Sequence, residues 1–284
     1  MPKASSAPAD PSPQYGDPIT VALLNVFLVP WMLSRKMKER KQIIVETLKE
    51  IDPDIISFQE VWFKRDKNYF KKELDEYEAH NREGFFPPRY HWSGLVTLSK
   101  LPIEKGEVVP WKEAQWYEKI TRRAFNVVYV QSPYGKPLRI VNAHFSCVKN
   151  PETNDMMQSQ REQMVEFLES EALPTIVTGD FNVNRYFQGI LPSNYKLISP
   201  DEELTVDPEN PLFKSGIAGK IGYGDKTCDL IFTNMRGKVI EKKVWTRPVV
   251  SDHYLVTSTF RPRIQSASYG GTVEPMLWTP PSRR

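Results

Sequence analysis

The feature that most limits the fold of this chain is a series of short apolar segments spread along its length. Each segment holds three to eight apolar residues, many of them β-branched or aromatic, and most are bounded by Gly, Pro, Asn, Asp or Ser. Such segments are typical of buried β-strands. They cover 20–29, 53–62, 93–103, 124–132, 137–147, 173–183, 229–234 and 254–260.

Two further segments have the period of an amphipathic helix. In 35–51, Met37, Ile44 and Leu48 recur at helical spacing with charged residues opposite them, and a second such pattern covers 159–170. Strands that alternate with helices favour the α/β class. We therefore expect one domain over 19–261, built as two packed, mixed β-sheets with helices outside. The Gly-, Pro- and Lys-rich segment 200–226 is expected to be a long loop.

Both ends of the chain differ in composition from this domain. Residues 1–18 are rich in Pro and Ser and are expected to be disordered, because proline removes backbone donors. Residues 262–284 contain four prolines and no clear period, which predicts an irregular tail. No internal repeat is visible.

Composition excludes several classes of protein. The 284 residues carry 38 Lys and Arg against 35 Asp and Glu, a net charge of +3. This charge is too small to argue for a dedicated nucleic-acid binder. A mean hydropathy of −0.48 excludes a protein with many membrane spans. The two cysteines, Cys147 and Cys228, are too few for a disulfide framework.

The sequence shows no targeting or membrane-spanning segment. The N-terminal residues lack the apolar stretch of a secretory signal. The first apolar run is interrupted by Asn25 and Pro30 and is too short to cross a bilayer. We therefore expect a cytoplasmic protein whose membrane contact, if it has one, is peripheral.

Polar residues that could do chemistry stand at the ends of the apolar segments. Burying such residues is costly unless they bind a metal, a ligand or a partner. Their repeated placement therefore points to one site. They are Asn25, Glu60, Asn142, His144, Asp180, Asn182, Asp229, Asp252 and His253.

The residue types suggest hydrolysis assisted by a metal ion. Glu60 offers the oxygen ligation that Mg²⁺ prefers. Asp180 and Asn182 alternate along an extended segment, so both can face one side. In Asp252–His253, an imidazole beside a carboxylate suits a general base. His144 can donate to charge that develops on a phosphate.

Other mechanisms lack their motifs. The sequence has no nucleophilic Ser or Cys in a suitable frame and no Gly-rich phosphate loop. Water attack assisted by a metal is therefore favoured over a covalent intermediate.

Each of these residues also has a structural interpretation. Asn25 could mark a β-bulge, His144 a hydrogen-bonded core histidine, and Asp180 a turn. Asp229 and the pair Asp252–His253 could cap a strand or a turn. All of these readings would have to hold at once for the site to be absent.

The order of these motifs resembles the endonuclease/exonuclease/phosphatase superfamily. The motifs are LLNVF, SFQEVW, SGLVTLSKLPI, VNAHF followed by SQREQMVEFL, TGDFNVN, CDLIF and SDHYLV, between about Thr20 and Arg261. That superfamily includes deoxyribonuclease I, abasic-site endonucleases, inositol-polyphosphate 5-phosphatases and neutral sphingomyelinases. The resemblance implies a four-layer α/β/β/α sandwich and Mg²⁺-dependent hydrolysis of a phosphoester, with Mn²⁺ as an alternative ion.

The resemblance also implies a role for each site residue. Glu60 would be the principal Mg²⁺ ligand, Asn25 would lie close to the metal, and Asp252 would serve a second metal site or orientation. His253 would activate the attacking water and Asp229 would orient its imidazole. Asp180 and Asn182 would position water and phosphate, and His144 would donate to the transition state or protonate the leaving group. Lys226, close to Asp229 in sequence, is a candidate phosphate anchor.

Within the superfamily, LLNVFLVPWML and FQEVW are most similar to neutral sphingomyelinases. The WNVNG pattern of abasic-site enzymes is absent, and so is the Arg that follows the Cys–Asp pair in 5-phosphatases. The sequence therefore predicts a phosphodiesterase acting on sphingomyelin or a related phospholipid. A DNA or RNA nuclease and a catalytically idle binding module are the alternatives.

Two surface features bear on the substrate. The aromatic residues of 85–92, together with Trp111, Trp116 and Tyr117, could contact lipid or could simply pack in the core and loops. The basic residues of 35–41 could form a solvated helix face or attract anionic headgroups or a nucleic-acid backbone.

Overall fold

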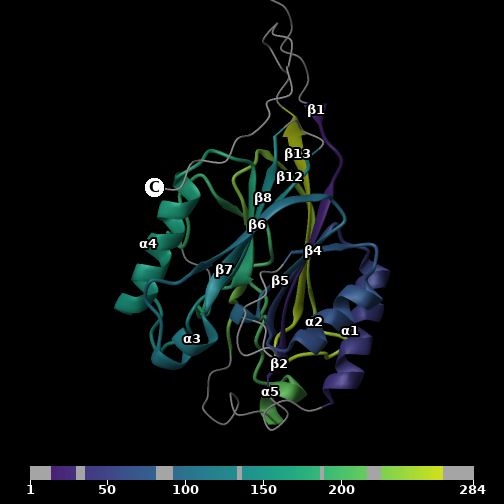
Figure 1. Ribbon diagram of the computed structural model, residues 1–284, viewed down its shortest axis with the longest axis vertical. Helices are drawn as coiled ribbons and strands as arrows, with labels where there is room; N and C mark the ends of the chain where they lie inside the picture. The colour runs from purple at the N-terminus through teal and green to yellow at the C-terminus, as the bar shows by residue number, and fades with distance from the viewer. Residues whose placement is uncertain are drawn as a thin grey trace, which may run out of the picture.

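The fold is a sandwich of two β-sheets with helices on both outer faces (Figure 1). The computed structural model describes residues 14–29, 36–80, 92–132, 136–185, 189–215 and 225–264. Within these residues the expected four-layer α/β/β/α architecture is confirmed: two mixed sheets in one domain, flanked by helices.

The first sheet has seven strands in the part of the chain that the structure describes. Its order is β1–β13–β2–β3–β5–β4, and β12 pairs with β13 at the edge. Only β2 and β3 run parallel among these pairs, as expected for strands joined through a helix. The strands are β1 (Gln14–Tyr15), β2 (Ile19–Leu28), β3 (Ile55–Val61), β4 (Glu78–His80), β5 (Val96–Ser99), β12 (Gly237–Trp245) and β13 (Leu255–Ile264).

The second sheet has six strands in the order β10–β11–β9–β8–β7–β6. Here β8 and β9 are the parallel pair, and the connection between them contains a helix. The strands are β6 (Ile103–Pro110), β7 (Ala124–Val130), β8 (Leu138–His144), β9 (Thr175–Asp180), β10 (Lys196–Leu197) and β11 (Asp229–Thr233).

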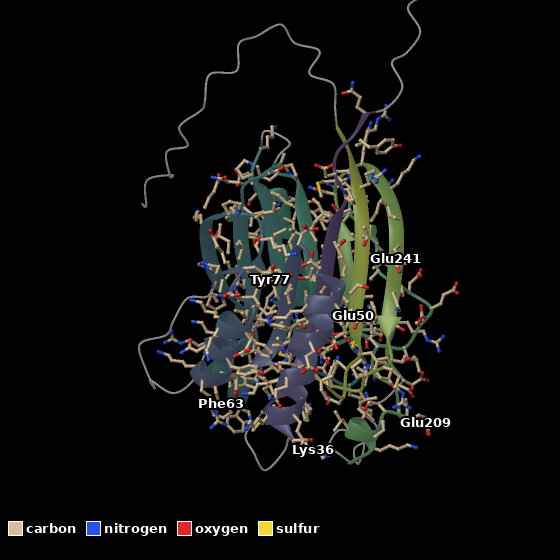
Figure 2. The ribbon with its side chains drawn as sticks, turned by 90° about the vertical axis from the view of Figure 1, so that its right-hand side faces the viewer. Lys36, Glu50, Phe63, Tyr77, Glu209 and Glu241 are labelled. Atoms are coloured by element: carbon tan, nitrogen blue, oxygen red, sulfur yellow. The ribbon has the colours of Figure 1, made fainter. Side chains whose placement is uncertain are left out.

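Helices cover the outside of each sheet. α1 (Met37–Ile51) and α2 (Lys64–Glu73) cover the first sheet, and α1 lies across it between the labelled residues Lys36 and Glu50 (Figure 2). α3 (Trp116–Thr121) and α4 (Asp155–Glu169) lie on the side of the second sheet. The short α5 (Pro211–Ser215) lies at one end of the sandwich, and the 3₁₀ helix η1 covers Trp92–Gly94.

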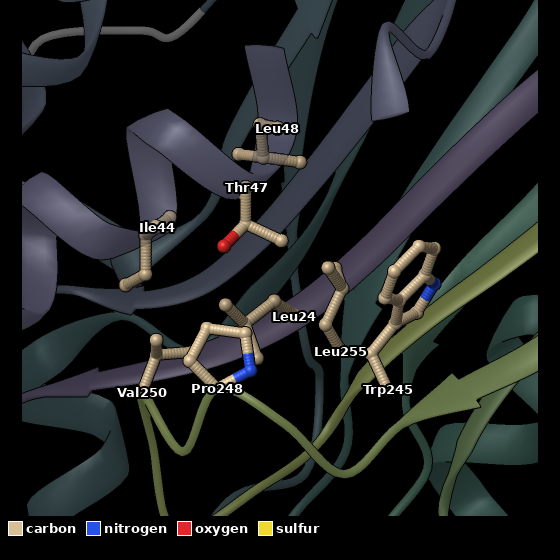
Figure 3. Close-up of a pocket in the computed structure, with 8 residues that line it drawn as sticks. All are labelled: Leu24, Ile44, Thr47, Leu48, Trp245, Pro248, Val250 and Leu255. Carbon is tan, nitrogen blue, oxygen red and sulfur yellow. The ribbon is translucent and has the colours of Figure 1, made fainter. Parts of the chain in front are cut away.

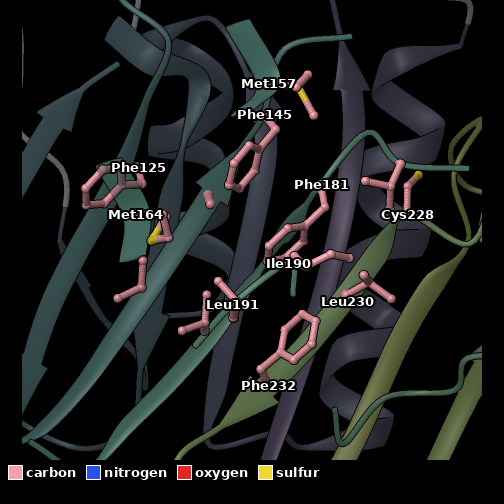
Figure 4. Packing of buried hydrophobic residues seen from close by; sticks show 14 of the residues in the cluster. Phe125, Phe145, Met157, Met164, Phe181, Ile190, Leu191, Cys228, Leu230 and Phe232 are labelled. Atoms are coloured by element: carbon pink, nitrogen blue, oxygen red, sulfur yellow. The ribbon is translucent and has the colours of Figure 1, made fainter. Parts of the chain in front are cut away.

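Three apolar layers hold the sandwich together. One lies between α1, α2 and the first sheet, and one lies between the two sheets. The third lies outside the second sheet, where Phe145, Phe181 and Phe232 pack together (Figure 4). Burial of this much apolar side-chain surface is the main favourable term in folding.

Several elements differ from the sequence predictions. Gln14 and Tyr15, placed in the disordered tail 1–18, pair with Ile264 and Arg263, so β13 also runs into the tail predicted for 262–284. The remainder of both tails lies outside the described residues. The helix predicted over 159–170 begins earlier, because the Asn154 side chain accepts a hydrogen bond from the backbone of Met157 and caps it. The segment 93–103 is not one strand, since β5 ends at Ser99 and β6 starts at Ile103.

Candidate active site

The second sheet brings three polar residues into neighbouring positions. His144 and Asp180 are the last residues of the parallel strands β8 and β9 and are paired in register. Asp229 begins the antiparallel strand β11 and is also paired with Asp180. The next residues, Phe145 and Phe181, stack in the outer apolar layer with ring centroids 5.0 Å apart. Side chains alternate between faces, so this packing directs His144 and Asp180 toward the first sheet.

The first sheet contributes a β-bulge at the end of the sandwich where these three residues lie. Asn25 pairs with Gln59 and Leu28 pairs with Val61, so two residues of β2, Val26 and Phe27, lie opposite the single Glu60. Phe27 and Glu60 have positive φ angles of 46° and 60°. These conformations are unfavourable for residues with a Cβ and cluster at functional sites. The bulge redirects the chain where Asn25 and Glu60 enter the site.

Asp180 is the centre of the resulting group. Its Oδ2 lies 3.1 Å from Asn25 Nδ2, 3.4 Å from His144 Nε2 and 3.8 Å from His253 Nε2. Asn25 Nδ2 also lies 3.3 Å from Glu60 Oε1. Burial opposes ionisation of Asp180, but the positive charge of His253 and hydrogen bonds from Asn182 and Asn25 outweigh it and lower its pKa to about 2. Asp180 is therefore an anion at neutral pH.

His253 is held by Asp229. The distance between His253 Nδ1 and Asp229 Oδ2 is 2.8 Å, and Asp229 is fully buried. Burial would lower the pKa of His253, but the carboxylates of Asp229 and Asp180 raise it well above its ordinary value. The bond to Asp229 fixes the ring so that Nε2 faces Asp180. This contact matches the role that the resemblance implies for Asp229, which is to orient the imidazole of His253.

His144 is in the opposite protonation state. Burial and the positive charge of Arg123 lower its pKa well below its ordinary value, against the opposing effect of Asp180. A neutral imidazole can donate one hydrogen bond but cannot serve as an imidazolium acid. This environment therefore suits His144 as a hydrogen-bond donor better than as the acid for the leaving group.

Four carboxylates gather at the site, those of Glu60, Asp180, Asp229 and Asp252. Burial raises the pKa of Glu60 and of Asp252, and the negative charge of Asp252 raises the pKa of Glu60 further. A divalent cation bound here would relieve this cost, and carboxylate oxygens suit Mg²⁺. The donor set thus fits a metal ion on the side of Glu60. Asn25 faces the carboxylates with its nitrogen, since its Oδ1 accepts from the backbone of Phe27 at 3.1 Å.

A second group of metal-ligand types lies nearby. Ligand atoms of Asp180, Cys228, Asp229 and His253 lie within 4.8 Å of one another. Burial raises the pKa of Cys228 well above its ordinary value, so its thiol stays protonated, and a thiol is a poor ligand for Mg²⁺. Asp229 and His253 already bind each other. We interpret this group as a hydrogen-bonded pair beside the metal site.

Two residues beside the site were not predicted from the sequence. The first is Arg123, whose positive charge acts to lower the pKa of Glu60 and of His144. Its Nη1 donates to the carbonyl of Phe145 at 2.9 Å. Asn182 Nδ2 donates to the same carbonyl at 2.9 Å. Arg123 is also paired with buried Glu118 at 3.4 Å. The only sequence signal was the Arg122–Arg123 pair directly before an apolar strand. The second residue that was not predicted is Ser251, whose Oγ donates to the carbonyl of Asn25 at 2.6 Å.

The remaining expectations have mixed outcomes. Lys226 is 6% exposed, and its Nζ lies 4.0 Å from Cys147 Sγ beside the site. Asn142 lies deeper between the sheets and accepts from Gln59 at 2.7 Å. Trp111, for which both lipid contact and core packing were open, is buried, whereas Trp116 is 75% exposed. Segment 85–91 and the side chains of Trp92 and Tyr117 lie outside the described residues.

The chain belongs to the Endonuclease/Exonuclease/phosphatase family, whose sequence profile matches residues 31–253. Members of this family are hydrolases that act on phosphoesters and typically use a divalent metal ion. A search of curated protein sequences found no significant match.

Solved structures with the same fold have different substrates. Zebrafish (D. rerio) TDP2 in complex with a single-stranded DNA product has a TM-score of 0.67 at 16% identity, covering 86% of this chain and 99% of that one. Sphingomyelinase C from Streptomyces griseocarneus has a TM-score of 0.66 at 15% identity, with the same coverage. A family protein from Leptotrichia buccalis has a TM-score of 0.64 at 22% identity, covering 85% and 99%. At these identities the comparison shows the fold alone.

Among the helices of the described residues, none is long and apolar enough to cross a membrane.

Proposed function

We propose that this protein is a Mg²⁺-dependent phosphodiesterase that hydrolyses sphingomyelin or a related phospholipid by direct attack of water. The observation that carries the proposal is the shared contact at Asp180. One ionised carboxylate lies within 3.8 Å of Asn25, His144 and His253, beside Glu60. Such a group can hold a metal ion, a water molecule and a phosphate together.

Each residue has a task that its environment suits. Glu60 and Asp252 would hold the metal, which would polarise the phosphate and add the positive charge that favours a neutral His253. His253, oriented by Asp229, accepts the proton of the attacking water through Nε2. Neutral His144 donates to a phosphate oxygen, and Asn182 and Lys226 position the phosphate. Arg123 adds a fixed positive charge to this end of the sandwich.

The surface beside the site supports a lipid substrate. Trp116 begins α3, and its backbone is held there because Gln115 and Glu118 form a capping box. Gln115 Nε2 donates to the carbonyl of Cys147 at 3.1 Å, which ties this helix to the segment that follows His144. An exposed tryptophan with Lys119 nearby on the same helix is typical of a membrane-interface contact.

The decisive experiment compares substrates. The protein would be incubated with Mg²⁺ and either mixed micelles of sphingomyelin or single-stranded and duplex DNA. We expect that the protein releases phosphocholine from sphingomyelin and leaves both kinds of DNA uncleaved. Cleavage of DNA alone would instead support a nuclease, the alternative that the complex of TDP2 with single-stranded DNA favours.

Three variants test the site and the surface. Glu60→Ala and His253→Ala should each lose activity by orders of magnitude, because metal and base both act in the transition state. Glu50→Ala, an exposed change on α1, is the matched control. Trp116→Ala should lower activity on micelles but not on soluble bis(p-nitrophenyl) phosphate, whereas Val239→Ser, an exposed apolar position on β12, should change neither. Full activity of Glu60→Ala would refute the assignment of the site.

A further inference from the structure

Arg40 is a buried cation on the inner face of α1. It is 4% exposed and lies on the same face of the helix as Ile44 and Leu48, which pack on the first sheet. The sequence placed it on a solvated basic face, and for Arg40 this is wrong. A buried guanidinium is costly unless its donors are satisfied. Three backbone carbonyls accept hydrogen bonds from this guanidinium.

Two of these bonds hold the β-bulge behind Asn25. Arg40 Nη2 donates to the carbonyl of Val26, and Nη1 donates to the carbonyl of Phe27 at 3.4 Å. The shift in register between Asn25 and Leu28 interrupts the pairing of β2 with β3 at these residues. Arg40 therefore supplies donors where the bulge has disturbed the strand ladder.

A third bond reaches the loop that carries Asp252 and His253. Arg40 Nε donates to the carbonyl of Val250 at 2.5 Å. Ser251 joins the same two segments from the other side through the carbonyl of Asn25. Figure 3 shows Val250 and Pro248 of this loop facing Ile44 of α1, next to Leu24 of β2. One side chain thus connects the Asn25 segment with the His253 segment.

The charge of Arg40 also acts on the site. Burial lowers its pKa, while the carboxylates of Asp252 and Glu60 raise it, so both acidic groups lie within reach of its field. A guanidinium keeps its charge and its planar set of donors when buried. Lysine has no such planar set and could not serve three carbonyls in this arrangement.

We propose that Arg40 is a positioning residue that holds the Asn25 bulge and the 250–253 loop at a fixed separation, so that Asn25, Asp252 and His253 meet correctly. Its effect on catalysis rests on the proposed function. Its effect on the geometry of the metal-free protein does not.

The test compares Arg40→Met and Arg40→Lys with Lys38→Met, an exposed change on the same helix. Activity would be measured on bis(p-nitrophenyl) phosphate with saturating Mg²⁺, well below the unfolding temperature. We expect kcat to fall about 100-fold in Arg40→Met with KM within about threefold, because a displacement of about 1 Å in a site can cost this much. Arg40→Lys should lie between Arg40→Met and wild type, and Lys38→Met should match wild type.

Amide hydrogen exchange on the metal-free protein provides the second readout. In Arg40→Met, exchange in 22–28 and 249–254 should increase at least tenfold more than exchange in β8 and β9. Equal increases throughout the chain, or unchanged kcat in Arg40→Met, would overturn the proposal and leave Arg40 a purely structural residue. If wild type hydrolyses no phosphodiester, the proposed function fails, and the exchange pattern still decides the role of Arg40. Should Arg40→Met not fold, Arg40→Lys carries both measurements.

Discussion

Replacing Asp229 by Asn tests the electrostatics of the site most directly. Asp229 Oδ2 lies 2.8 Å from His253 Nδ1, and the side chains of Asp229 and His253 are 0% and 13% exposed. Two unit charges about 4 Å apart interact by about 4 kcal/mol at an effective dielectric constant near 20. In the wild type this attraction favours the protonated imidazole. Asp229→Asn should therefore lower the raised pKa of His253 toward the ordinary value of histidine.

The assay is an NMR titration of the metal-free protein. The chain has only four histidines, so the His253 imidazole can be assigned by substitution. Asp201→Asn is the matched control, because Asp201 forms an exposed ion pair with Lys242. An unchanged His253 pKa in Asp229→Asn would refute the electrostatic account. Because the correct tautomer is also lost, kcat/KM should fall by about 10²- to 10⁴-fold.

The same variant predicts a pH-dependent change in stability. A raised pKa in the folded state means that the protonated His253 stabilises the fold. This contribution is present below the ordinary pKa of histidine, about 6.5, and is lost as the pH rises through the raised value. The difference in unfolding free energy between wild type and Asp229→Asn should be largest near about pH 6 and decrease at higher pH. Urea unfolding at several pH values measures it.

Three further substitutions give distinct outcomes. Glu60→Gln should raise the melting temperature of the metal-free protein, because burial disfavours the charged carboxylate and raises its pKa, whereas the amide is uncharged. Scanning fluorimetry should also show that added Mg²⁺ no longer stabilises this variant. Arg123→Met should raise the pKa of His144 in the NMR titration and cost about 3 kcal/mol in urea unfolding, since buried Glu118 loses its ion-pair partner. Lys226→Ala should raise KM about tenfold with kcat within about threefold, as expected for a residue that binds phosphate in ground and transition states alike; a fall in kcat alone would contradict that role.

The sequence predicted the strands that are buried on both faces and missed those that are not. β3, β8 and β9 read as continuous apolar runs because helices or the other sheet cover each side. β12 was missed, since seven of its nine residues are exposed and its GKVIEKKVW sequence has no apolar period. α2 was missed because Lys and Arg dominate it and only Phe70 marks its apolar side.

The same distinction explains what could be predicted of the site. Asn25, Glu60, His144, Asp180 and Asp229 interrupt apolar strands, and their types alone suggested a shared site. The structure brings them together, while their chemical roles remain predictions.

Arg40 and Ser251 could not be found in this way, because each acts by donating to backbone carbonyls distant in sequence. Such contacts depend on how β2, α1 and the 246–254 connection pack. No local pattern records that packing. Trp111 and Trp116 show the same limit, since the sequence could not tell the buried ring from the exposed one.

The site draws Asn25 and Glu60 from one sheet and His144 and Asp180 from the other, so its dimensions depend on how the two layers are aligned. That alignment is set by the apolar residues between them, among them Val21, Ile140 and Ile231. Any sliding of one layer over the other would separate the halves while leaving each strand intact. Hydrolysis should thus be lost at milder denaturing conditions than secondary structure, and turnover becomes a sensitive gauge of interlayer packing in this molecule.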